Sequence, residues 1–571
     1  MSPHSSAPSD HFPLWDTIAQ SKRAARDAAI PSVWQLRPDQ IPDDQLDVTG
    51  VPADCGILTD KEVEITETDA TVLVQKLVNR DYSSHEVGGL ALDSYLYQVN
   101  CLSEIFFDRA LEAAEHLDTE YAASGIPSGP LHGLPISLKD CFKVEGTDAT
   151  IGYTAFANQP TAEEDESEVT KILRDSGAVL YCKTNVPIAL MSGETHNAIY
   201  GYTSNPYNRN MSSGGSSGGE SALLALKGAP LGVGTDVGGS VRIPASFCGL
   251  YSLKPSFGRF PTYGIQDGLK GQEAVRNAIG PMAKSLDGVE IWSKAVLKSE
   301  PWMNGDPDCL PIPWRDVQVP KKLCFGLLLD DGIVKPLPPV TRGLLLTKAA
   351  LEAAGHTVIE FRIIDELSEE PLFLDTLKHV LYRSATAELI GGTLRKTNEP
   401  WPRGYELLAD MLGHSSNGEL SANDPATVSD LWKAQTQRTK FAKGILQSWA
   451  ATKIRTETGR EMDALLMPCS PWPASPKHGF IYDNYTSLWN VLDYCATTLP
   501  VTKVSSVEDL RPEYKGRNEL EAQVWENYSP EHMIGCPVAV QLVGRRLNEE
   551  YILGVTRACD AALRDAAWVS S

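Results

Sequence analysis

The sequence predicts an α/β fold in which helices surround a central, mixed and twisted sheet, and two observations lead to this prediction. From Gly133 onward, short apolar segments typical of buried strands alternate with segments of helical periodicity. The composition is that of a globular protein, with 42% hydrophobic and 22% charged residues, and 571 residues are enough to bury a large core.

The first part of the chain predicts an arm and several helices. Residues 1–65 are rich in Pro and Asp and favour a short helix followed by an extended arm. Residues 66–571 contain no obvious linker, so we expect a single domain there, with Thr66 opening a helical segment. Residues 83–85 are expected to cap the next helix, whose apolar periodicity runs from Leu90 to Leu102.

Further elements follow in order along the chain. The predicted helices are residues 110–124, 169–175, 221–227 and 340–354, with a mainly helical region at 365–456. The predicted strands are residues 133–139, 178–183, 231–235, 323–329, 356–361, 463–467 and 538–543. Because strand 323–329, helix 340–354 and strand 356–361 follow one another closely, they predict a βαβ unit.

Charge and cysteine content exclude several classes of protein. A net charge of −23 repels phosphate backbones and anionic lipid, so neither nucleic acid nor a membrane is an expected partner. The eleven cysteines are scattered without CxxC pairs or zinc-ligand spacing, and no metal site is expected. The polar, acidic start does not resemble a secretory signal, and no segment is apolar enough to span a bilayer, so a cytoplasmic protein is expected.

Two Ser/Gly clusters are the most informative feature of the chain. The first is SSGGSSGG at residues 212–219, and the second is DVGGS at residues 236–240. A flexible linker is one interpretation of such a composition. It is disfavoured by the helical segment that adjoins the first cluster and by the strand that precedes the second. A phosphate-binding loop is a second interpretation, but the Walker and Rossmann glycine patterns are absent.

A third interpretation is a serine hydrolase, which needs both the serines and the glycines of these clusters. A serine nucleophile needs a base for its proton, and successive glycines allow backbone N–H groups to approach the oxyanion that forms. Lys139, in LHGLPISLKD, could be that base, and no GxSxG elbow is present. A histidine base, His132 or His196, stays open. A cysteine nucleophile at Cys141 or Cys248 is disfavoured because neither has a histidine at a recognisable motif spacing.

Long segments resemble the amidase signature family. GGSSGGESALLALKGAPLGVGTDVGGSVRIPASFCGLYSLKPSFGR is similar to the family signature, and LHGLPISLKD is similar to its lysine motif. The similarity extends to TNVP at 184–187, Gly280–Pro281 and GCPVAVQLVGRR at 535–546, and covers roughly residues 70–560. The segments IPSVWQL and GILTDKEVEITE resemble fungal acetamidases in particular. The resemblance implies the amidase signature fold, with residues 66–571 as its catalytic domain.

The resemblance also implies a role for each serine and for the lysine. Ser240 would be the nucleophile, Ser216 the bridging serine and Lys139 the base, with a cis peptide bond between Gly215 and Ser216. Lys139 must be neutral for this role, so burial has to lower its pKa by several units from about 10.4. The alternative for Lys139 is a surface side chain paired with Asp140.

Supporting and substrate-binding residues are also implied. The oxyanion hole would consist of the backbone amides of Val237, Gly238, Gly239 and Ser240. Loop-bracing residues would be Ser217, Asp236 and Arg242, each of which could instead be plainly structural. Substrate would meet Ser216 and the segment Met191, Ser192 and Gly193, although a methionine is more often part of the core.

The function that the resemblance implies is hydrolysis of a carboxamide to an acid and ammonia or an amine, through an acyl-enzyme and without metal or cofactor. Small aliphatic amides such as acetamide are the first substrates expected, with carbamates, aryl amides and fatty-acid amides as alternatives. Two other classes stay open, a glutamine-dependent amidotransferase subunit and a non-catalytic binding protein with the same fold. The expected partner is the small amide, and a homodimer is one open quaternary state.

Overall fold

One large mixed sheet organises the structure. The computed structural model describes residues 14–34, 36, 42, 44–90, 99–363, 380–381, 386–402, 427–526 and 528–566. Within them, eleven strands form one sheet in the order β1-β3-β2-β8-β10-β9-β14-β15-β13-β11-β12. The strands are β1 Leu102–Ile105, β2 Pro135–Lys139, β3 Val179–Thr184, β8 Leu231–Asp236, β9 Tyr251–Lys254, β10 Ala278–Ala283, β11 Cys324–Leu327, β12 Thr357–Glu360, β13 Ala464–Pro468, β14 Cys495–Lys503 and β15 Pro537–Gly544. Two small ribbons pair β4 His196–Asn197 with β5 Gly201–Tyr202, and β6 Ser204–Asn205 with β7 Asn208–Ser212.

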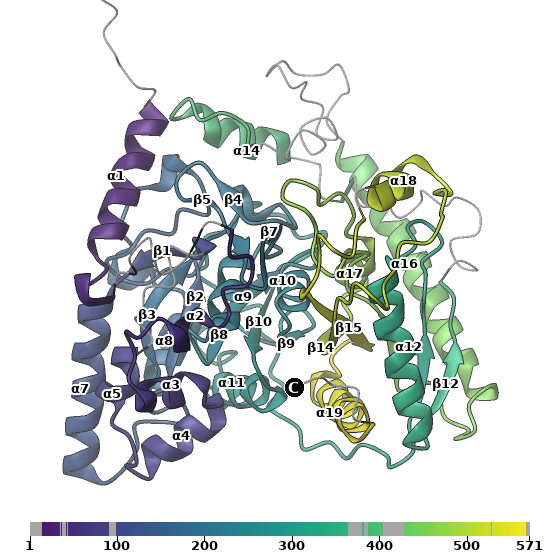
Figure 1. Cartoon of the computed structure of the whole chain (residues 1–571), viewed down its shortest axis with the longest axis horizontal. Helices are drawn as coiled ribbons and strands as arrows, with labels where there is room; N and C mark the ends of the chain where they lie inside the picture. Colours follow the sequence, from purple (N-terminus) through teal and green to yellow (C-terminus); the bar gives the residue numbers. More distant parts are fainter. Residues whose placement is uncertain are drawn as a thin grey trace, which may run out of the picture.

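The sheet combines parallel and antiparallel pairs, which confirms the predicted mixed α/β class. Strand β2 runs parallel to both β3 and β8, whereas the central strands from β8 through β10, β9, β14 and β15 to β13 pair antiparallel. The predicted βαβ unit is also confirmed, because β11 and β12 are parallel and helix α12 (Pro338–Ala353) connects them. Helices lie at both ends of the molecule, with strands of the sheet between them (Figure 1).

The helices follow most of the predicted ranges. They are α1 Leu14–Ala28, α2 Val51–Asp54, α3 Asp60–Glu67, α4 Ala70–Val78, α5 Ser84–Leu90, α7 Phe107–Ser124, α8 Glu168–Asp175, α9 Gly218–Ala225, α10 Arg242–Phe247, α11 Leu286–Lys298, α12 Pro338–Ala353, α14 Thr386–Arg395, α16 Val428–Ala451, α17 Asn484–Val491, α18 Glu519–Glu526 and α19 Glu549–Asp565. Strands β1, β9, β10 and β14 and helices α10, α11, α17 and α19 had no sequence-based prediction.

Two boundaries differ from the prediction near the start of the domain. Thr66 does not open a helix, because it lies inside α3. That helix begins after Thr59, where Thr59 and Glu62 form a reciprocal capping box. Leu102 does not end a helix but begins strand β1, which pairs with β3. Between them, residues 91–98 of the predicted periodic helix lie outside the described residues. The division at residue 65 stays a prediction.

The N-terminal helix packs against the main body of the chain. In α1, Arg26 donates to Asn100 Oδ1 at 2.9 Å and to the carbonyl of Leu102 at 3.2 Å. Lys22 of the same helix pairs with Glu104 and, at 2.8 Å, with Asp148. Among the described residues, no helix has both the length and the hydrophobicity needed to cross a membrane.

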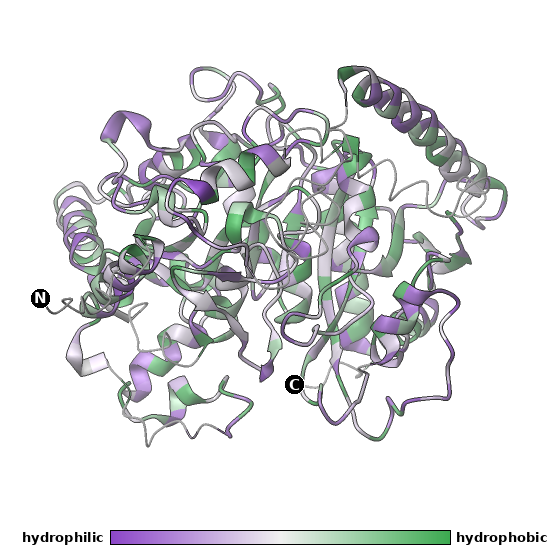
Figure 2. Ribbon diagram, turned by 90° about the horizontal axis from the view of Figure 1, so that it is seen from above, coloured by the Kyte–Doolittle hydropathy of each residue, from purple (hydrophilic) through white to green (hydrophobic). Residues whose placement is uncertain are grey.

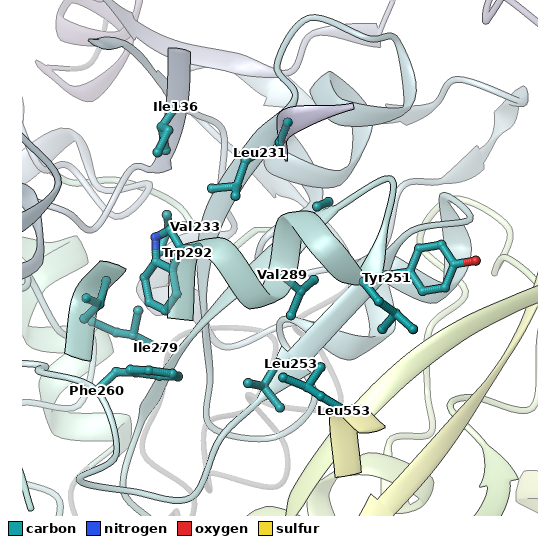
Figure 3. Close-up of a cluster of buried hydrophobic side chains, with 14 of the residues drawn as sticks. Ile136, Leu231, Val233, Tyr251, Leu253, Phe260, Ile279, Val289, Trp292 and Leu553 are labelled. Atoms are coloured by element: carbon teal, nitrogen blue, oxygen red, sulfur yellow. The ribbon is translucent and has the colours of Figure 1, made fainter. Parts of the chain in front are cut away.

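A core of buried side chains holds β2, β8, β10 and β9 in place. Figure 3 shows this cluster, in which Trp292 and Val289 of α11 face side chains of these strands. The strand residues Ile136, Leu231, Val233, Leu253 and Ile279 are fully buried. Figure 2 shows hydrophobic residues gathered along the strands and hydrophilic residues on the outer helices. Because interiors are close-packed, this core fixes the ends of β2 and β8, where the polar residues lie.

Candidate active site

Lys139 is the last residue of β2, which pairs with β8, and its side chain contacts Ser216 of the first Ser/Gly loop. Its Nζ is 2.7 Å from Ser216 Oγ, 2.8 Å from Thr235 Oγ1 and 3.3 Å from the Thr235 carbonyl oxygen. The lysine side chain is completely buried. The fold therefore brings together a lysine and a serine that are 77 residues apart in the chain.

Burial changes the acidity of this lysine. Desolvation lowers the pKa of Lys139 to about 8, against the opposing influence of nearby groups that include Asp236 and Asp267. The alternative of a surface lysine paired with Asp140 is wrong. Asp140 instead accepts hydrogen bonds from Ser103 Oγ at 2.8 Å and from the Ile151 N–H at 2.7 Å. A lowered pKa increases the fraction of Lys139 side chains that are neutral near pH 7.

The first Ser/Gly cluster is a buried loop between β7 and α9. All of residues 212–219 are buried, so the linker interpretation is wrong. The Gly215–Ser216 peptide bond is cis, as the resemblance implied. A Cβ at Gly215 would lie 2.6 Å from the carbonyl oxygens of Ser192 and Glu194, so only glycine fits there. The loop is thus held against a neighbouring segment of backbone, with Ser216 directed to Lys139.

The second cluster is a loop between β8 and α10, and Asp236 organises it. The carboxylate of Asp236 accepts from the N–H groups of Gly239 at 2.8 Å and Val241 at 3.1 Å. Thr486 Oγ1 of α17 donates to the Gly238 carbonyl at 2.8 Å. Burial alone would raise the pKa of Asp236, but the neighbouring Arg242 guanidinium holds it well below its usual range. The lowered pKa favours the ionised form of Asp236, and the hydrogen bonds of its carboxylate brace the loop.

Arg242, at the start of α10, neutralises this buried carboxylate. Its Nε and Nη2 lie 3.0 Å from the two carboxylate oxygens of Asp236. The remaining donors reach Asn490 Oδ1 of α17 at 2.7 Å and Gln541 Oε1 of β15 at 3.1 Å. Arg242 therefore ties the second loop to two elements that come much later in the chain.

Ser216 and Ser240 line the same small pocket. Ser240 is 7% exposed and Ser216 only 1%, so Ser240 is the more accessible of the two residues. The Ser217 N–H donates to the Ser240 carbonyl at 3.1 Å and joins the two loops, while Ser217 Oγ is 3.5 Å from the Thr235 carbonyl. The other lining residues are Ala189, Leu190, Met191, Thr235, Val237, Asp267, Leu269, Gln272, Val275 and Asn277.

Comparison with known proteins identifies the family. A family model described as Amidase matches residues 91–553. The chain belongs to the amidase family. It is thus a hydrolase that acts on carbon–nitrogen bonds of amides. The chain is 39% identical to the putative amidase kk1C of Curvularia clavata, over 95% of this chain and 97% of that protein. It is 36% identical to an acetamidase of Aspergillus oryzae, with the same coverage of 95% and 97%, which confirms the resemblance to fungal acetamidases.

Solved structures confirm the fold of this amidase. A fatty acid amide hydrolase superposes with a TM-score of 0.88 at 30% identity, covering 97% of both chains. A 6-aminohexanoate cyclic dimer hydrolase has a TM-score of 0.66 at 21% identity, covering 88% of this chain and 98% of that one, and shows the same fold.

Only part of the predicted substrate segment of the amidase lines the pocket. Met191 lines the pocket, as does Ser216. Ser192 lies behind the loop, with its carbonyl oxygen against Gly215, and a Cβ at Gly193 would meet the ring of Phe480 at 2.2 Å. A substrate role for all four residues stays a prediction.

The alternative bases and nucleophiles lie outside the pocket lining. His132 packs edge-on against Tyr121 at 4.9 Å between ring centroids, and burial lowers the pKa of His196 to about 4. Burial raises the pKa of Cys141 and of Cys248 to about 12, so both thiols stay protonated. Protonated thiols are poor nucleophiles.

Several residues of the site had no sequence-based role. Thr235, Gln541 and Asn490 contact Lys139 or Arg242 directly. Thr235 lies at the end of a predicted strand, and Gln541 lies in GCPVAVQLVGRR. Both segments resemble the family, so their positions in the sequence could have indicated that these residues lie near the site. Asn490 offered none, because it reaches the site only through the placement of α17.

Proposed function

We propose that this amidase hydrolyses small aliphatic carboxamides, with acetamide as the first substrate, through an acyl-enzyme on Ser240. The observation that carries the proposal is the buried 2.7 Å contact between Lys139 Nζ and Ser216 Oγ, beside Ser240 in one pocket. Lys139 has a pKa of about 8, and a base is most useful when its pKa lies near the working pH.

The reaction follows from this arrangement of two hydroxyls and one amine. Ser240 Oγ attacks the amide carbonyl carbon and passes its proton to Ser216 Oγ, while the Ser216 proton moves to neutral Lys139 Nζ. The proton then returns through Ser216 to the leaving nitrogen, the C–N bond breaks, and ammonia departs. Water attacks the acyl-enzyme through the same relay and releases the acid. Thr235 holds Lys139 in place through its hydroxyl and its carbonyl.

The backbone amides from Val237 to Ser240 form the proposed oxyanion hole. Donors of this kind stabilise the charge that develops on the carbonyl oxygen during attack. The Gly239 N–H already donates to Asp236 Oδ1, so in this proposal that amide is shared between Asp236 and the oxyanion. Asp236 and Arg242 act by holding the loop, and Ser217 acts by joining it to the first loop.

The named relatives favour a small substrate. The pocket beside the two serines has an apolar wall that includes Leu190, Leu269 and Val275. Relatives at 36% and 37% identity are named acetamidases. The similarity to a fatty acid amide hydrolase at 30% identity supports a second candidate, amides with longer acyl chains.

We also propose that this enzyme is cytoplasmic and that its partner is a small neutral amide. A net charge of −23 suits a small neutral amide better than nucleic acid. The structure describes all eleven cysteines, and none of them forms a disulfide bond; reduced thiols are typical of the cytoplasm. A homodimer stays an open prediction for the quaternary state.

A substrate panel tests this function. The purified chain is incubated with acetamide, propionamide, acetanilide, a methyl carbamate, a long-chain fatty amide and glutamine, and released ammonia or amine is measured. We expect kcat/KM to be highest for the two- and three-carbon amides. A preference for the fatty amide would favour the second candidate. Turnover of glutamine alone, increased by a partner protein, would instead indicate an amidotransferase subunit.

The pH dependence of kcat/KM reports on Lys139. The proposed base is the neutral amine, and its pKa is lowered to about 8, so its neutral fraction grows as pH rises. We expect kcat/KM for acetamide to rise about tenfold per pH unit below pH 8 and to level off above it. Initial rates across this range give the profile, and a melting curve at each pH controls for unfolding. A profile that falls through pH 8 would contradict the role of Lys139.

A further inference from the structure

Asn277, a residue of the pocket lining, has a side-chain oxygen for which the described part of the chain provides no hydrogen-bond partner. Asn277 precedes β10, and the pairing of Ala278 with Asp236 places it alongside Val237 in the second loop. Among the described residues, Asn277 Oδ1 is buried and has no hydrogen-bond partner. A buried acceptor without a partner is costly and rare in native proteins, so it calls for a ligand or another explanation.

Asp267 adds a second acceptor to the same wall. It lines the pocket together with Asn277, and its Oδ1 accepts from the Leu269 N–H at 2.9 Å. Gln272, the third polar residue nearby, braces the loop instead, because its amide both accepts from and donates to the Val275 backbone at 2.7 Å. Asn277 and Asp267 therefore remain as groups that can accept hydrogen bonds from a ligand.

We propose that Asn277 and Asp267 form an acceptor subsite that selects amides whose acyl group carries a hydrogen-bond donor on the α carbon. The inference rests on the proposed function, and it names the substrate class within the small amides. Asn277 and Asp267 line the same pocket as Ser216 and Ser240, so a substituent on the α carbon of an acyl group held at Ser240 lies near them. A carboxylate accepts hydrogen bonds and attracts positive charge, so an ammonium group or a hydroxyl suits this wall better than a methyl group.

Three substrates of equal size test the subsite. Propionamide, 2-hydroxyacetamide and 2-aminoacetamide have the same number of heavy atoms and end in a methyl, a hydroxyl and an amine. We expect Asn277→Leu to lower the ratio of kcat/KM for 2-hydroxyacetamide over propionamide by about five- to tenfold, the effect of one lost hydrogen bond. Asn277→Asp retains an acceptor and should keep the ratio. Asp267→Asn should lower the preference for 2-aminoacetamide over 2-hydroxyacetamide.

The controls separate folding, catalysis and selectivity. Asn79→Leu replaces an exposed asparagine after α4 and should leave all three rates unchanged. Turnover of propionamide shows that a variant is folded, and Asn277→Val is a second apolar variant if Asn277→Leu fails to fold. An unchanged ratio in the folded apolar variant would overturn the subsite.

A binding measurement keeps the subsite distinct from the proposed function. In Ser240→Ala, ligand-observed NMR compares the binding of 2-hydroxyacetamide and propionamide with and without Asn277→Leu. If the wild type hydrolyses no amide, the proposed function fails, but a binding preference that disappears with Asn277→Leu still supports the subsite. Equal binding of both compounds in Ser240→Ala would overturn it.

Discussion

Replacing Ser240 with alanine is expected to lower kcat/KM for the preferred amide by at least about 10⁴-fold, because the attacking oxygen is removed. Ser240 is the more exposed of the two pocket serines, and its loop is held by Asp236, so the substitution should not disturb the fold. Ammonia release measures the loss. A fluorophosphonate probe, which labels an active serine covalently, should label the wild type and leave Ser240→Ala unlabelled.

A second serine in α10 provides the matched control for this experiment. Ser246 is buried close to Ser240 in the sequence, but its hydroxyl donates to the Ile243 carbonyl within the helix at 2.8 Å. Ser246→Ala should therefore stay within about threefold of the wild-type rate, because only one internal hydrogen bond is lost. Persistent labelling or near-normal turnover in Ser240→Ala would reject Ser240 as the nucleophile.

Replacing Arg242 with leucine is expected to lower the free energy of unfolding by about 3–5 kcal/mol, the usual cost of removing one partner of a buried ion pair. Arg242 and Asp236 are both fully buried, and the two nitrogen–oxygen distances are 3.0 Å. Without the guanidinium, the Asp236 carboxylate loses its compensating charge. Chemical denaturation measures the change, and catalysis should fall as well because Asp236 also holds the amide of Gly239.

The double variant Asp236→Asn with Arg242→Leu separates the charge from the packing. Removing the carboxylate charge eliminates the unpaired anion, so the double variant should be more stable than Arg242→Leu alone. Its activity should stay low, because an asparagine cannot accept all the hydrogen bonds that the two carboxylate oxygens accept from the loop. Denaturation curves that coincide for wild type and Arg242→Leu would show that the ion pair contributes little.

Local patterns predicted the individual elements well. Strands 178–183 and 538–543 and helix 340–354 match β3, β15 and α12 within a few residues, because uninterrupted apolar runs and helical periodicity are properties of the local sequence. The helix predicted through Leu102 ends earlier, because Leu102 pairs with Thr184 in the sheet instead. Strand pairing is a tertiary interaction, and it outweighed the local periodicity there.

The site could be predicted only in part. Lys139, Ser216 and Ser240 stand in long segments that resemble a family, so their identity could be inferred from the order of residues. Asn490, Gln541 and Asn277 could not be inferred, because their relation to the loops depends on which strands and helices become neighbours.

The order of residues alone predicts the groups proposed for catalysis in this amidase: two serines, a lysine and glycines whose backbone can approach a ligand closely. The lowered pKa of Lys139 and its contact with Ser216 come only from the tertiary structure. The same is true of the Asn277 oxygen, which has no hydrogen-bond partner within the described ranges. The physical reason is that acidity and hydrogen bonding depend on desolvation and on distances of a few ångströms. Both are set where β2, β8 and β10 pack side by side.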